Sequence, residues 1–159
     1  MNSQRAQTLI DDYASNSWLI HRLVDGITHE ASLYQLPFSA NCLNWLLGHI
    51  VWRRTSALTT LDLPSPWGET IIAKYQTNSK PIQSSKDARH LAKLLADLDY
   101  TQQVLSVKLA NIEDTELDKV VVNDRGEKRV IEHLQGFHWH ETYHIGQLDI
   151  LRAFIEYKG

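Results

Sequence analysis

The chain has 159 residues, of which 43% are hydrophobic and 22% charged, as in an average globular protein. This composition excludes disorder, collagen-like repeats and coiled-coil rods, and the length suits a single domain over residues 1–159. A net charge of −3 leaves no positive excess for a phosphate backbone, so we expect no nucleic-acid partner. No apolar stretch approaches the ~20 residues that span a bilayer. One cysteine and an N-terminus without the order of a signal peptide predict a cytoplasmic protein.

Three segments in the first two thirds of the chain carry apolar residues at helical spacing. Gly26 suits a C-terminal cap of the first segment, and Ser39 suits an N-cap of the second. Ser84 precedes the third and forms a weak capping box with Asp87. The expected helices run from about 6 to 26, 39 to 63 and 84 to 109.

The sequence after residue 117 changes character. Three consecutive valines and the turn residues Asn123, Asp124 and Gly126 predict a short hairpin or an extended loop. Helical spacing then returns from Val130 to Tyr157. Four amphipathic helices with two long connections predict an all-α four-helix bundle rather than an α/β fold.

Two histidines lie on the apolar stripe of the last expected helix. At 100° per residue His140 is about 40° from His144, whereas His138 points about 120° away. A lone histidine on such a stripe is usually a hydrogen-bonded core residue. A buried pair at i and i+4 is costly, because each ring needs partners and two cations would repel. A divalent metal ion resolves both difficulties, since it accepts two imidazole nitrogens at one point.

A third ligand would have to come from another helix, and the second helix offers His49. Its angle, about 120° from the centre of the Leu43 and Ile50 stripe, predicts a boundary position. Trp45 and Trp52 share the side of His49, so this helix is apolar on two faces and both should be covered. On spacing alone, a boundary residue and an inward ligand remain open as alternatives.

The same second helix carries two further expectations. Trp45 and Trp52 lie on a side that the Leu/Ile stripe does not use, and an exposed apolar patch of this kind predicts a homodimer. Cys42 lies two turns before His49, roughly 10 Å along the axis, which is too far to share an ion. We therefore expect Cys42 to be a buried filler.

The letters HETYH, from His140 to His144, also match the zinc-protease pattern H-E-x-x-H. One subclass would need glycine and histidine where Gln147 and Ile150 stand. Another would need a later helix for its third ligand, and little chain follows His144. We therefore disfavour a peptidase. Glu141 lies about 60° from His144, which leaves two roles open, a partner of a ligand or a carboxylate at the rim, and we favour the first.

The run NWLLGHIVW, followed some ninety residues later by HWHETYHIGQLDILRAF, resembles the DinB superfamily of metal-binding four-helix bundles over nearly the whole chain. The most specific element is H-x-x-x-H-x-G-Q, which is present as His140, His144, Gly146 and Gln147. The resemblance implies that His49, His140 and His144 bind one divalent ion, zinc or nickel, with water in the open positions. It also implies an up-down-down-up bundle with a long crossover, and frequent homodimers.

Characterised members of that superfamily include mycothiol-dependent maleylpyruvate isomerases and bacillithiol transferases, which use the metal to activate a small thiol. The resemblance therefore implies a metal-dependent enzyme, a small-thiol S-transferase or a hydrolase, with a small-molecule substrate. The alternative is a non-catalytic metal-binding stress-response protein. A structural zinc is normally closed by four protein ligands. This chain offers three, with His133 a poor fourth about two turns from His140, which favours an open site.

Overall fold

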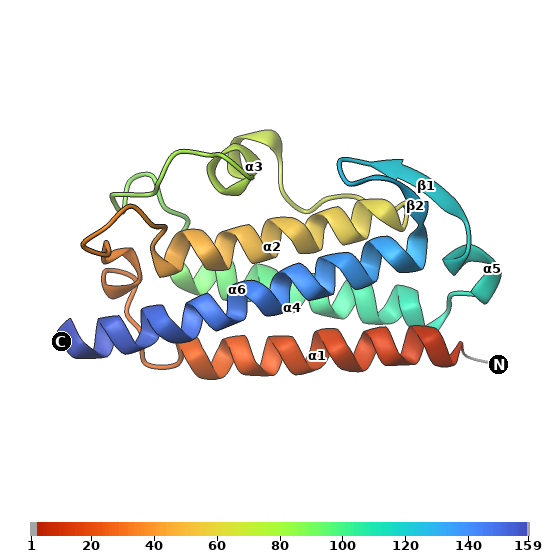
Figure 1. Ribbon diagram of the computed structural model, residues 1–159, viewed down its shortest axis with the longest axis horizontal. Helices are drawn as coiled ribbons and strands as arrows, with labels where there is room; N and C mark the ends of the chain where they lie inside the picture. The colour runs from red at the N-terminus through yellow and green to blue at the C-terminus, as the bar shows by residue number, and fades with distance from the viewer. Residues whose placement is uncertain (1–2, 159) are drawn as a thin grey trace.

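Four long helices form a bundle in the computed structural model, which describes residues 3–158 (Figure 1). The neighbouring pairs are α2 with α6, α6 with α1, α1 with α4, and α4 with α2, so the helices close a ring around a shared core. Following the colours of Figure 1, α1 and α6 run one way along the bundle, and α2 and α4 run the other. The predicted helical bundle is confirmed. Its helices are α1 (Gln4–Val24), α2 (Leu43–Thr60), α4 (Leu91–Ala110) and α6 (Val130–Lys158).

The ends of α1 follow local chemistry. Ser3 accepts a hydrogen bond from the Ala6 amide at 3.1 Å and so caps the N-terminus. Gly26, just beyond the C-terminus, has a φ of 76°, a left-handed conformation that glycine adopts without steric cost. The expectation that Gly26 ends this helix is confirmed.

The starts of α2 and α4 differ from the sequence expectation. The cap of α2 is Cys42 rather than Ser39, and α4 begins after His90 rather than near Ser84. At the second site, the Arg89 amide donates to the Tyr75 hydroxyl at 2.7 Å, and Asn44 donates to the Arg89 carbonyl at 3.0 Å. Because these tertiary hydrogen bonds engage the Arg89 amide and carbonyl, Arg89 does not continue a helix that begins at Ser84. The capping signal at Ser84 therefore produces only a turn.

Two short helices and one 3-10 turn lie in the connections and were not expected from the sequence. They are too short to show a helical period. The long connection between the parallel helices α2 and α4 is fixed to the core by Trp67, Tyr75 and Ile82, all of which are buried. The added elements are η1 (Ala31–Leu33), α3 (Glu69–Tyr75) and α5 (Asp114–Leu117).

The predicted hairpin is confirmed as β1 (Val120–Asn123) paired antiparallel with β2 (Gly126–Arg129). Gly126 has a φ of 93° at the turn, a value that favours glycine. His133, 1% exposed, donates from Nε2 to the Val121 carbonyl at 3.1 Å. This histidine therefore attaches the hairpin to α6.

A buried polar layer divides the apolar core into two clusters. At its centre Arg54 of α2 and Glu141 of α6, each 1% exposed, form two hydrogen bonds of 2.8 and 2.7 Å. Arg54 also donates to the Tyr13 carbonyl of α1 at 3.0 Å and to Gln102 of α4 at 2.8 Å. A single guanidinium thus joins α2 to each of the other three long helices. Within residues 3–158, no helix has both the length and the apolar character needed to cross a bilayer.

Candidate metal centre

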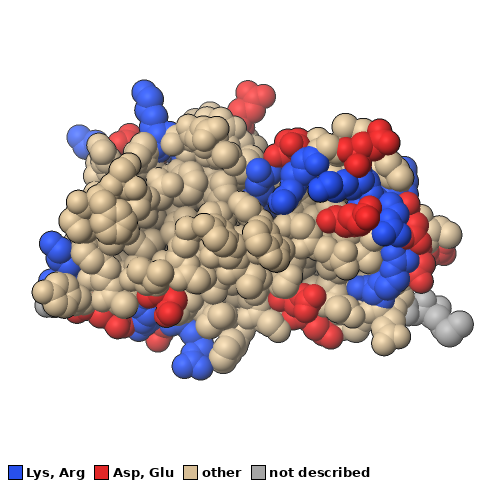
Figure 2. All heavy atoms as spheres, viewed as in Figure 1, with Lys and Arg blue, Asp and Glu red and all other residues tan. Residues whose placement is uncertain are grey.

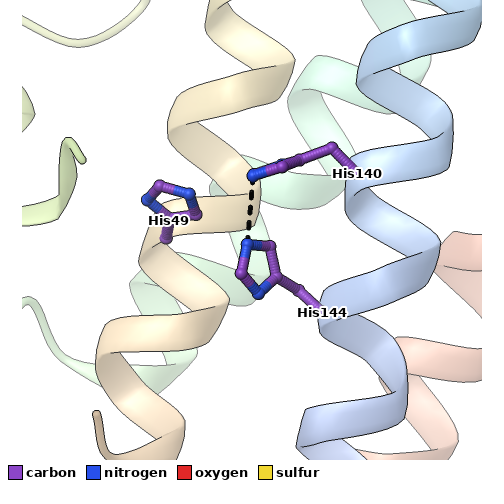
Figure 3. A group of neighbouring side chains, drawn as sticks. All are labelled: His49, His140 and His144. Carbon is purple, nitrogen blue, oxygen red and sulfur yellow. Dashed lines mark hydrogen bonds between the residues drawn. The ribbon is translucent and has the colours of Figure 1, made fainter. Parts of the chain in front are cut away.

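Three histidines meet between α2 and α6. Figure 3 shows His49 pointing from α2 toward His140 and His144, which lie one turn apart on α6. One ligand nitrogen from each ring lies within 4.8 Å of the other two. Bonds of ~2.1 Å in a tetrahedral arrangement would place such nitrogens about 3.4 Å apart. The structure therefore brings the expected ligands together to within a small side-chain adjustment of one ion.

Two of these rings are oriented by hydrogen bonds on the nitrogen away from the cluster. His49 Nδ1 is 2.7 Å from the Tyr75 carbonyl, and His144 Nδ1 is 2.7 Å from the Gln147 side-chain oxygen. Because these oxygens can only accept, each Nδ1 carries the proton and each neutral ring keeps its lone pair on Nε2. Metal-binding histidines commonly have such a partner, which fixes the tautomer and the ring orientation.

The third ring, His140, lacks a comparable partner. Its Nε2 lies 3.1 Å from His144 Nε2, and its Nδ1 is buried without a hydrogen bond. Because His144 keeps its lone pair on Nε2, His140 Nε2–H donates across this contact in the metal-free protein. Coordination of an ion through His140 Nε2 would move that proton to the unpaired Nδ1.

The environment keeps all three imidazoles neutral. Burial is the main cause, and it lowers the pKa of His49 to about 4 and that of His140 to about 3. The pKa of His144 is also lowered by burial, although its bond to Gln147 opposes the shift. The positive charge of Arg53 lowers all three values further. A neutral imidazole is the form that binds metal, so the donor set fits a divalent ion without first losing protons.

These shifts predict that the metal-free protein loses stability in mild acid. The unfolded chain takes up protons near the ordinary histidine pKa of 6.5, while the folded rings stay neutral to lower pH. Stability from this source is nearly complete above pH 7.5 and falls as the pH drops through 6.5, down to about 4 for His49 and about 3 for His140. His49 alone should account for about 2 kcal/mol between pH 7 and pH 5. Urea unfolding at both values, with His49→Gln as a control that lacks the titrating group, measures the loss. If the free energy of unfolding fell equally between pH 7 and pH 5 in the two proteins, the prediction would be contradicted.

The surroundings of His49 decide between a boundary and a buried position. His49 is 3% exposed and therefore buried rather than at a boundary, because α3 and its flanking loops cover the second apolar face of α2. Trp45 stacks on the His49 ring at 4.7 Å and donates to Ser79 at 2.8 Å. The expectation that both faces of α2 are covered is confirmed.

The same packing removes the argument for an exposed tryptophan patch. Trp45 is 6% exposed, and Trp52 is partly buried with the Arg53 guanidinium 4.0 Å from its ring centre.

The homodimer itself stays a prediction. Light scattering on the purified protein measures it, and a mass near 18.3 kDa at micromolar concentration would contradict it.

Gly48 lets the Tyr75 ring approach α2 closely. A Cβ atom at this position would overlap the ring. Gly48→Ala should therefore displace Tyr75, whose carbonyl holds His49, and cost about 1–3 kcal/mol of stability as other overpacked sites do. Metal affinity should fall about 10- to 100-fold through the lost anchor.

Gly68→Ala is the matched control for that variant, because a Cβ at Gly68 meets open space. Urea unfolding and metal titration of both variants give the comparison. If Gly48→Ala bound metal as tightly as Gly68→Ala, the role of the Tyr75 anchor would be wrong.

The other candidate residues lie away from the cluster. Glu141 does not hydrogen-bond a histidine, because Arg54 takes both of its carboxylate oxygens, so the favoured role as a ligand's partner is wrong. The H-E-x-x-H match therefore lacks a free glutamate base. His138 points away as expected, although it is partly buried with its ring edge-on to Tyr13 at 5.4 Å. Cys42 is buried, as predicted for a filler, and burial raises the pKa of its thiol.

The cluster lies beside an open cleft of about 640 Å³. Its walls come from α6, the start of α2 and the loops before α2 and after α3. Among the residues that the structure describes, the lining includes no Asp, Glu, Lys or Arg. In Figure 2 the centre and left of this face are likewise mostly uncharged, whereas Lys and Arg gather toward the hairpin end. A ligand of small-molecule size could thus reach the three histidines from solvent.

No family model matches the chain, and a search of curated proteins finds no match.

Proposed function

We propose that this protein is a divalent-metal-binding enzyme of the DinB superfamily, with His49, His140 and His144 as ligands of one zinc or nickel ion. The observation that carries the proposal is the convergence of three neutral imidazoles at the base of an open cleft. The chain directions in the bundle agree with the topology that the resemblance implies. Gln147, the last residue of the H-x-x-x-H-x-G-Q pattern, orients His144 through its side-chain oxygen.

The open side of the cluster supports a catalytic rather than a purely structural role. The group of ligating side chains within residues 3–158 contains three members, and a structural zinc is normally closed by a fourth. When bound here, a divalent ion would lower the pKa of a small thiol or of water and so supply a nucleophile near neutral pH. The residues around the cluster would hold the ligands in place and shield them: Tyr75 orients His49, and Trp45 covers its ring. We therefore favour a thiol S-transferase or a hydrolase.

Purification without an affinity tag, followed by elemental analysis and chelation, tests the metal. Reloading with zinc or nickel should raise the melting temperature, because an ion that binds only the folded state stabilises it. A protein that takes up less than about one tenth of an equivalent from micromolar zinc or nickel would overturn the proposal.

The reaction is tested by a screen of small thiols with electrophilic acceptors. Thiol consumption that requires the reloaded metal, and that His140→Ala abolishes, is the expected result. Stable metal binding without any metal-dependent turnover would instead support the non-catalytic alternative.

A further inference from the structure

The chemistry of the cleft walls narrows the class of ligand that the site accepts. One wall is apolar and includes Leu36 and Phe38 before α2, and Tyr143, Ile150 and Leu151 on α6. Phe38 and Ile150 are about two thirds exposed, so these side chains present apolar surface at the mouth rather than packing into the core.

Another part of the lining is polar without being charged. Thr77, Asn78 and Ser79 lie directly after α3, and Asn41 precedes α2. Ser79 already accepts a hydrogen bond from Trp45 at 2.8 Å and donates to the Lys74 carbonyl at 2.9 Å. Because the Ser79 proton is engaged, the amides of Asn41 and Asn78 and the hydroxyl of Thr77 are the neutral hydrogen-bonding groups of this part of the lining, which offers no counter-ion.

The nearest cation that acts on the histidines is also unable to serve a charged ligand in the cleft. Arg53 lowers the pKa of all three rings, but its guanidinium pairs with Asp124 at 2.6 Å and stacks over Trp52 at 4.0 Å. It does not line the cleft. A carboxylate or phosphate on the ligand, away from the ligated atom, would lose water without gaining a partner.

We infer that the cleft selects an uncharged, largely apolar small molecule with one metal-ligating group, such as an aromatic or alkyl thiol, and discriminates against thiols that carry a distant carboxylate. The part of this inference that assigns a thiol to the ligand rests on the proposed function, because the ion would hold the thiol beside the histidines. The selection for a neutral body rests on the walls alone and applies with or without the ion.

Calorimetric titration with matched thiols tests this selection. The probes are benzyl mercaptan, 4-(mercaptomethyl)benzoate, which adds only a distant carboxylate, and 2-mercaptoethanol, which lacks the apolar body. With zinc-loaded protein, benzyl mercaptan should bind about tenfold more tightly than either of the other two. Chelator-treated protein should bind every probe more weakly but keep the preference for benzyl mercaptan.

Ile150→Lys locates the effect in the cleft. This residue is 66% exposed, so the substitution should leave the fold intact while it supplies the missing cation at the mouth. The preference against the benzoate thiol should then fall to about threefold or less, because the carboxylate gains a partner. Val107→Lys on α4, at a position 61% exposed and outside the cleft lining, is the control and should keep the full preference.

The possible failures are distinguishable. Equal or tighter binding of the benzoate thiol to the unaltered protein overturns the inference, whatever the ion contributes. If the preference for benzyl mercaptan is present but zinc does not tighten the binding of any thiol, the inference stands and the proposed thiol activation is contradicted.

Discussion

The His144→Ala variant will bind zinc at least about 100-fold more weakly than the unaltered protein. Loss of an outer hydrogen-bond partner of a metal ligand already costs about 10- to 100-fold, and loss of a ligand should cost more. The same result is expected for His49→Ala and His140→Ala, because each ring supplies one of three nitrogens that lie within 4.8 Å of one another. Metal content after dialysis against a zinc buffer measures the affinity.

His138→Ala is the internal control for this series. It removes an imidazole from the same helix, two residues from His140, but from a ring that lies against Tyr13 rather than in the cluster. This variant should retain full occupancy. Equal losses for His138→Ala and His144→Ala, or full occupancy in His49→Ala, would show that the ligand assignment is wrong.

Glu141→Gln will destabilise the metal-free protein by about 3–5 kcal/mol. The substitution leaves the Arg54 guanidinium, 1% exposed, without the carboxylate that now accepts two of its hydrogen bonds. An unpaired buried charge is among the most costly defects in a core. Urea unfolding of the chelator-treated protein measures the change without any contribution from bound metal.

The double variant Arg54→Met/Glu141→Leu distinguishes two causes of instability, the absence of the ion pair and the presence of one unpaired buried charge. Replacement of a buried pair by apolar residues of similar volume is often neutral or stabilising, so this variant should recover most of the lost stability. Glu156→Gln is a surface control that makes the same chemical change, since the pair of Glu156 with Arg152 is partly exposed and worth at most ~1 kcal/mol. A Glu141→Gln effect as small as that of Glu156→Gln would contradict the importance of the buried pair.

The long helices and the hairpin could be predicted because their signals are local. Apolar spacing marks the stripes, Gly26 marks an end, and the Val-rich run before Gly126 marks the strands. The proximity of His140 and His144 could also be predicted from the sequence, since both residues lie on one helix. The position of His49 required the resemblance, because its burial depends on α3, a seven-residue helix without a readable period.

The role of Glu141 could not be inferred from its own helix. Its partner Arg54 lies 87 residues earlier in the chain, and nothing in a helical wheel identifies which buried cation faces which carboxylate. Tertiary contact also decided the start of α4, where Tyr75 and Asn44 take the backbone groups of Arg89. Both differences arise from interactions between segments distant in sequence, which local patterns do not encode.

The stability of the candidate metal centre depends on the connection between α2 and α4. Tyr75 and Ser79, which orient His49 and Trp45, belong to this crossover and not to the four long helices. Segments outside the main helical core can open without global unfolding. Release of this crossover would expose the buried Trp67, Tyr75 and Ile82 and free the His49 ring while the long helices stay packed. A bound ion would then exchange through this local opening rather than through unfolding of the whole bundle.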